Sequence, residues 1–174
     1  QGAKLLGQDL SRRTLVATVE DRPGVLSHVV TLFRRRNYNI ESLAVGHTEK
    51  PGISRMTIVV DSSRTDVEMV VQNLLKLVNV IRVEDVTDVP TVMRDLALVK
   101  VRAGDGATRA EIMQIVDTFR ARVVDVGLKS LMVEVTGTDD KINGLVEVLR
   151  PYGIDEMVRT GRVAMARGGG EIAA

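Results

Sequence analysis

Residues 20–26, EDRPGVL, form the segment whose residue types best suit ligand binding. Residues 14–19 before it read as a buried strand, and apolar residues from Val25 onward recur at helical spacing, which predicts a tight turn that opens a helix. Pro23 has a fixed φ and no N–H, and Gly24 has no Cβ to keep a ligand from the backbone. Free N–H groups at a helix start bind carboxylates or phosphates. Anion binding without a catalytic side chain nearby favours sensing over turnover.

An ordinary strand–helix connector with one Pro and one Gly explains the same turn, so the segment alone does not decide. No other residues predict catalysis. The chain has no cysteine, which excludes thiolate metal sites and cysteine nucleophiles, and no serine lies in a Gly-x-Ser-x-Gly setting. His28 and His47 lack neighbouring ligand patterns, and Asp139 and Asp140 stand near a helix start, where acids complement the dipole. We therefore expect neither a metal site nor an active site.

Two other segments suggest nucleotide or RNA binding only weakly. Residues 103–107, AGDGA, lack the Gly-Lys-Ser/Thr of a phosphate loop, so a capped turn is the better reading. Arg34, Arg35 and Arg36 end a helical pattern, where cations complement the dipole. RNA-binding sheets of this topology display stacking aromatics, and the chain has only two Phe and two Tyr. With a net charge of +1, we expect no nucleic-acid partner.

The composition is that of an ordinary soluble globular protein. The 174 residues are 44% hydrophobic and 27% charged, enough for one domain or two small ones. No apolar run approaches the roughly 18 residues needed to span a bilayer. Residues 1–13 do not resemble a secretory signal. We expect a cytoplasmic protein without a membrane partner.

The first half of the chain predicts the element order β-α-β-β-α-β. Strand patterns occupy residues 14–19, 40–45, 54–60 and 80–86. Helical apolar stripes begin at Val25 and Val67, and Ser63 with Asp66 resembles a helix cap before the second stripe. A Pro-Gly pair at residues 51–52 marks the turn between the two middle strands.

The second half repeats this order approximately. Strands are expected at residues 96–101, 123–126, 131–135 and 154–158, with helices at 112–119 and 142–149. Thr108 with Glu111 resembles a capping box for the first of these helices. The repeat predicts an α+β fold of two ferredoxin-like βαββαβ domains, each with both helices on one face of an antiparallel sheet. The open faces carry apolar residues, so two units or two chains should cover them, and a homodimer is favoured.

These patterns also predict the domain boundaries. We expect an N-terminal extension at 1–13, a first ferredoxin-like domain carrying the anion-binding turn at 14–87, a linker at 88–95, a C-terminal ferredoxin-like domain at 96–165 and a tail at 166–174.

Three segments closely resemble the regulatory small subunits of acetohydroxyacid synthase, also called acetolactate synthase. They are EDRPGVL at 20–26, LFRRRNYNIESLAV at 32–45 and SRMTI at 54–58. The first half resembles the ACT domain of this family, and the similarity continues through residues 76–78, 98–101 and 159–161. It covers nearly the whole chain except residues 1–13 and the tail. Pro-Gly after a strand is common to many ACT domains, whereas YNIES together with SRMT is much more specific to this subunit.

The resemblance implies a noncatalytic homodimer in branched-chain amino acid biosynthesis. Such a dimer activates a separate catalytic large subunit and confers allosteric feedback inhibition by valine. The catalytic partner condenses pyruvate with pyruvate or 2-oxobutyrate, using thiamine diphosphate, Mg and FAD, none of which should bind this chain. A free-standing ACT-domain amino-acid sensor is the alternative.

The resemblance further implies that valine lies between two ACT domains. One copy supplies the turn that meets its carboxylate and the other supplies the start of a strand: Asp21, Gly24, Val25 and Leu26, with Asn39 and Ile40. Asp21 suits an ammonium group, and Asn39 suits either charged end. Family members often have Asn where Asp21 stands, so the valine response itself stays open. Leucine or isoleucine also stay open, because a pocket distinguishes one methylene by only about 1–3 kcal/mol.

Overall fold

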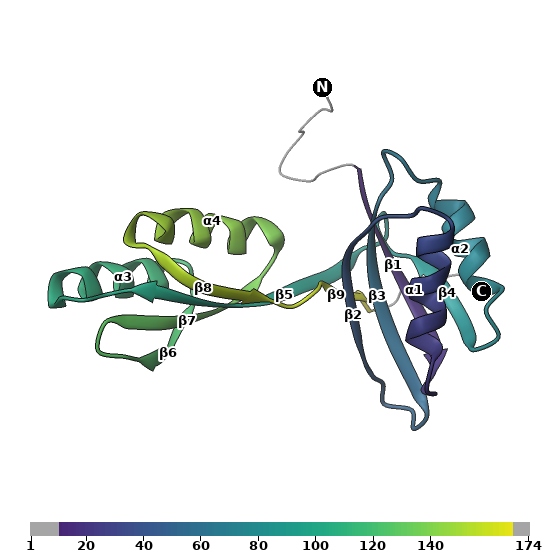
Figure 1. Cartoon of the computed structure of the whole chain (residues 1–174), viewed down its shortest axis with the longest axis horizontal. Coiled ribbons are helices and arrows are strands. Elements are labelled where there is room, and N and C mark those ends of the chain that lie inside the picture. The colour runs from purple at the N-terminus through teal and green to yellow at the C-terminus, as the bar shows by residue number, and fades with distance from the viewer. Residues whose placement is uncertain (1–10, 169–174) are drawn as a thin grey trace. The chain divides into compact units, whose positions relative to one another are not determined.

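A computed structural model describes residues 11–168 and divides them into two units (Figure 1). Residues 11–92 and 162–168 form the first unit, and residues 93–161 form the second. Of the expected extension 1–13, residues 1–10 lie outside the described part, as do residues 169–174 of the expected tail. No helix in the described part is long and apolar enough to cross a membrane.

The first unit has the predicted order β-α-β-β-α-β. Its elements are β1 (Arg12–Glu20), α1 (Val25–Arg35), β2 (Ile40–His47), β3 (Ile53–Asp61), α2 (Val67–Leu75) and β4 (Val80–Asp85). The strands form one sheet in the order β2-β3-β1-β4, with every neighbouring pair antiparallel. Alternate residues of β1, namely Leu15, Ala17 and Val19, pack against Phe33 of α1 and Leu74 of α2. The core of this unit therefore lies between the sheet and its two helices.

The second unit repeats the arrangement. Its elements are β5 (Thr91–Arg102), α3 (Gly106–Thr118), β6 (Arg122–Val126), β7 (Ser130–Gly137), α4 (Asp139–Leu149), the short 3-10 helix η1 (Arg150–Tyr152) and β8 (Ile154–Arg159). The strand order β6-β7-β5-β8 matches that of the first unit, strand for strand. Val99 and Val133 of the sheet and Ile112 and Leu145 of the helices lie in one buried cluster. The predicted class of two ferredoxin-like βαββαβ units is confirmed.

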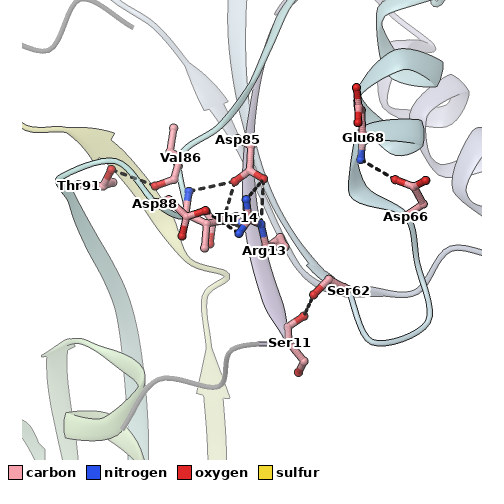
Figure 2. Close-up of polar contacts among 11 residues, drawn as sticks. Ser11, Arg13, Thr14, Ser62, Asp66, Glu68, Asp85, Val86, Asp88 and Thr91 are labelled. Carbon is pink, nitrogen blue, oxygen red and sulfur yellow. Dashed lines mark hydrogen bonds and ion pairs between the residues drawn. The ribbon is translucent and has the colours of Figure 1, made fainter. Parts of the chain in front are cut away.

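Two helix starts differ from the predicted caps. The N-cap of α2 is Asp66 rather than Ser63, and its carboxylate accepts the N–H group of Glu68 at 3.1 Å (Figure 2). It also accepts the N–H group of Met69 at 3.3 Å. The N-cap of α3 is Asp105 rather than Thr108, so the expected capping box is wrong. In both helices the capping carboxylate lies two or three residues before the N–H groups that donate to it, which is the geometry of an N-cap.

Ion pairs hold the strand ends where the chain leaves the first sheet (Figure 2). Arg13 donates from Nε at 3.0 Å and Nη2 at 2.7 Å to Asp85, and from Nη1 at 2.7 Å to Asp88. Thr87 donates its hydroxyl to Asp85 at 2.6 Å and accepts the N–H of Thr14 at 2.8 Å. Burial lowers the pKa of Arg13, but the two carboxylates outweigh it and raise that pKa above its ordinary value. These contacts thus hold the start of β1 against the end of β4.

The chain crosses between the units twice. β5 begins at Thr91, inside the stretch expected as a linker at 88–95, because its first residues are already hydrogen-bonded as a strand. The chain returns at Arg162, where β9 (Val163–Ala166) pairs with β5 and belongs to the first unit. The expected C-terminal domain at 96–165 therefore ends with four residues that belong to the other unit. Four residues are too few to show a strand periodicity in the sequence.

The returning segment covers part of the sheet face opposite the helices. Val16 and Val59 are buried on this face, although neither belongs to the core cluster beneath the helices. Ala164 of β9 is 5% exposed, and its carbonyl accepts a hydrogen bond from Arg55 of β3 at 2.7 Å. We expected a second unit or a second chain on this face, and a piece of the same chain supplies part of the cover.

Candidate functional site

The turn between β1 and α1 is held by backbone hydrogen bonds. The N–H of Asp21 donates to the carbonyl of Gly52 at 2.8 Å, and the N–H of Arg22 donates to that of Glu20 at 3.0 Å. Gly24 is the N-cap residue of α1 and has a φ of 88°, in the left-handed region. A side chain is disfavoured there for steric reasons, so the backbone conformation of the turn is itself a reason for glycine at this position.

The start of α1 presents unused hydrogen-bond donors. The helix has no side-chain cap and no acidic residue in its first turn. The N–H of Val25 makes a long bond of 3.3 Å to the carbonyl of Arg22, whereas the N–H groups of Gly24, Leu26 and Ser27 have no acceptor within residues 11–168. Exposed donors at the positive end of a helix dipole suit a carboxylate. The anion cradle expected from the sequence is thus geometrically available.

The equivalent turn of the second unit is filled by its own side chain. The carboxylate of Asp105 accepts the N–H of Thr108 at 2.9 Å and the Thr108 hydroxyl at 2.8 Å. The bond from the Thr108 backbone has the larger effect and the bond from its hydroxyl the next, and both lower the pKa of Asp105 below its ordinary value. This carboxylate therefore stays charged in the cap. AGDGA at 103–107 is the capped turn we expected. An anionic ligand therefore finds an open helix start in the first unit but not at α3.

The side chains around the first turn divide into buried and exposed ones. Val25 is only 4% exposed and packs in the core, so it can offer a ligand its backbone but not its side chain. Leu26 is 43% exposed and presents an apolar surface beside the free donors. The carboxylate of Asp21 lies 3.2 Å from Nδ1 of His47, at the end of β2. His47 is the neighbour that sequence reasoning missed, because only strand pairing brings it here.

Asn39 and Ile40 lie at the opposite end of the same sheet. Ile40 pairs with Val60, and Val60 pairs with Arg13 at the start of β1. Asp21 follows eight residues after Arg13, which is roughly 26 Å along a strand at about 3.3 Å per residue. One copy of the chain thus does not bring the six expected residues together. A site containing all of them requires a second copy, as the resemblance implied.

Asp139, one of the acids considered at the start of α4, has a structural partner. Asp139 pairs with Arg159 of β8, which also donates from Nε to Asp95 at 3.0 Å. Among the described residues no three or more His, Cys, Asp or Glu side chains gather as a metal site would require. Asp95 and Asp139 thus both pair with Arg159 inside the second unit.

Two βαββαβ units with matching strand orders define a protein of the ACT-type fold class. The family model for the small subunit of acetolactate synthase matches residues 94–168 of the sequence. The family model for the ACT domain of acetohydroxyacid synthase small subunits matches residues 15–82. The chain is 50% identical over 155 residues to the acetolactate synthase small subunit of Mycolicibacterium smegmatis, covering 89% of this chain and 91% of the relative. It is 48% identical to that of Bacillus subtilis over 158 residues, covering 90% and 91%.

A solved structure agrees with the sequence relatives. The acetolactate synthase small subunit of Thermotoga maritima superposes with a TM-score of 0.81 at 34% identity, covering 90% of this chain and 97% of the other. The chain belongs to the family of acetohydroxyacid synthase small subunits, which are regulatory subunits. The resemblance drawn from EDRPGVL and the YNIES segment is confirmed.

Proposed function

We propose that this chain activates the catalytic large subunit of acetohydroxyacid synthase and makes it sensitive to feedback inhibition by valine. The observation that carries the effector half of the proposal is the open N-terminus of α1, where the N–H groups of Gly24, Leu26 and Ser27 have no acceptor in the described part of the chain. Membership of the small-subunit family supports the activating half. We place the complex in the cytoplasm.

Each end of a valine molecule finds a complementary group at this turn. The carboxylate accepts from the free donors at Gly24 and Leu26, and the Asp21 carboxylate attracts the ammonium group. The exposed side chain of Leu26 offers the isopropyl group an apolar contact. Asn39 and Ile40 come from the second copy and close the site. The proposal keeps all six expected residues but uses Val25 through its backbone only.

A homodimer is required by this arrangement. β2 is an edge strand of the first sheet, so one side of its backbone is free to pair with another chain. Val45 of β2 and Val30 of α1 are 47% and 43% exposed, and they offer apolar surface at the edge strand and on a helix. We therefore place the dimer contact on the β2 edge and α1 of the first unit.

Regulation follows if valine binds one state of the complex more tightly than the other. A coupling of about 1–3 kcal/mol would be an ordinary allosteric effect. In this proposal thiamine diphosphate, Mg and FAD serve the catalytic partner, and this chain contributes neither a cofactor ligand nor a reacting group.

Reconstitution with the cognate catalytic subunit tests the proposal. The isolated chain should form no acetolactate, should raise the turnover of its partner, and should make that turnover fall as valine is added. Unchanged partner turnover, with valine still bound by the isolated chain, would instead establish the free-standing amino-acid sensor. Acetolactate formation by the isolated chain would refute a purely regulatory role.

A further inference from the structure

Arg162 joins two strands of the first sheet on the face away from the helices. Its backbone N–H donates to the hydroxyl of Ser42 on β2 at 3.0 Å, and its Nη1 donates to the hydroxyl of Thr14 on β1 at 3.1 Å. Ser42 and Thr14 both pair with Val59 of β3, so the three residues form one row across the sheet. Outer strands of such a row lie about 10 Å apart, at about 4.8 Å per strand. Arg162 thus spans the row over the buried Val59 side chain.

Ser42, one member of this row, lies two residues after Ile40, which belongs to the proposed effector site. The β2–β3 register shifts between Ile40 and Ser42, leaving Glu41 as an extra residue next to Asn39 and Ile40. A bulge weakens the strand ladder locally and allows it to bend. The hydrogen bond to Ser42 comes immediately after this irregularity. Arg162 therefore fixes β2 where the ladder alone fixes it least.

We propose that Arg162 is a positioning residue for the effector site, holding the start of β2 so that Asn39 and Ile40 are presented in the geometry that the second copy requires. This inference rests on the proposed function. We call the two hydrogen bonds from Arg162 to Ser42 and Thr14 the clamp. Arg162 directly follows Gly161, the last residue of the second unit, so the clamp lies where the chain passes from the second unit to the first. Effector affinity consequently depends on a residue that touches no part of the effector.

Thr14→Val in the full-length chain removes the hydroxyl that accepts from Arg162 and keeps the side-chain shape. The backbone bonds of Thr14 with Thr87 and Val86 remain. Because this charged hydrogen bond acts on the effector only through the position of β2, only part of its free energy should reach the effector. The valine concentration for half-inhibition of the reconstituted synthase should therefore rise by about three- to tenfold. Thr14→Ser, which keeps the hydroxyl, should restore the wild-type value. Maximal activation without valine should be unchanged in both variants.

Thr57→Val is the matched control. Thr57 is a buried threonine on the same sheet face, and it makes no hydrogen bond to Arg162 within the described residues. Its valine response should match the wild type. Equal responses of Thr14→Val and Thr57→Val, in a complex that valine inhibits, overturn the inference and leave the proposed function standing. A wild-type complex indifferent to valine overturns both.

Linkage supplies a second measurement. If the clamp favours effector binding, the effector must favour the clamp by the same factor. Amide exchange measured across residues 159–167 of the full-length chain should therefore slow when valine is added, and Thr14→Val should reduce that protection. Valine binding without protection of this segment contradicts the inference.

Discussion

Asp21 and His47 face each other at one end of the first sheet, with Oδ2 of Asp21 3.2 Å from Nδ1 of His47. β1 and β2 run parallel on either side of β3, so their final residues meet at the same end. Both side chains are solvent-exposed, which limits the strength of the pair. The contact with His47 nevertheless occupies the carboxylate to which we assign the effector ammonium.

His47→Gln should therefore strengthen valine inhibition of the reconstituted synthase. An exposed pair is worth about 0.2–1 kcal/mol, so we expect about a two- to threefold lower half-inhibition concentration. Glu156→Gln, which removes an exposed ion pair with Lys100 in the second unit, is the control and should leave the valine titration unchanged. Weaker inhibition in His47→Gln would show that the imidazole itself holds the effector.

Gly24→Asp should abolish or greatly weaken valine inhibition while most activation remains. A Cβ at Gly24 meets nothing within 4 Å, so the change fits sterically, although its φ of 88° strains any side chain. The new carboxylate competes for the donors at the helix start and repels the effector. Losing one charged hydrogen bond is worth about 1.5–3 kcal/mol, or roughly ten- to hundredfold in affinity.

Gly24→Asn separates charge from strain, because Asn is nearly the same size and tolerates the left-handed conformation better than most residues. Its valine titration should shift less than that of Gly24→Asp. An unchanged curve for Gly24→Asp would remove this turn from the effector site.

Mixing two defective variants tests whether each site needs two copies. Gly24→Asp and Asn39→Ala should each lose valine sensitivity when alone. In a mixed dimer one site receives both changes and the other receives neither, so about a quarter of all sites should regain wild-type affinity after random exchange. Calorimetric titration of the mixture with valine measures that fraction. No recovery, with exchange verified by mass, would mean that one copy supplies the whole site.

The cap of α3 predicts a pH-dependent contribution to the stability of the second unit. The pKa of Asp105 is lowered in the folded state, so its contribution is present above the ordinary carboxylate pKa and is lost as pH falls through the folded value. Asp105→Ala should therefore destabilise the chain at pH 7, and the difference from wild type should shrink below about pH 4. Urea unfolding at several pH values measures it. Asp105→Asn, which keeps an acceptor oxygen, should lose less at pH 7. A pH-independent difference would contradict the charged cap.

Local sequence signals predicted most of the fold because they depend on neighbours along the chain. The alternation in residues 14–19 and the apolar stripe from Val25 identify β1 and α1, and the approximate repeat identifies the second unit. The caps of α2 and α3 were misassigned because more than one Ser, Thr or Asp residue lies near the start of each helix. Which of them caps depends on where the first helical hydrogen bond forms, and helix packing against the sheet sets that point.

The sequence by itself determined the turn at Gly24, the chemistry of a free helix start and membership of the family. Tertiary structure decided what surrounds that turn. Strand register brings His47 to Asp21 and carries Asn39 to the far end of the sheet, and register is a property of pairing between distant segments. The sequence also gave no sign that the chain returns to the first unit at Arg162, because the strand that follows has only four residues. Ser42 and Thr14 lie more than a hundred residues before Arg162, and only folding brings them together.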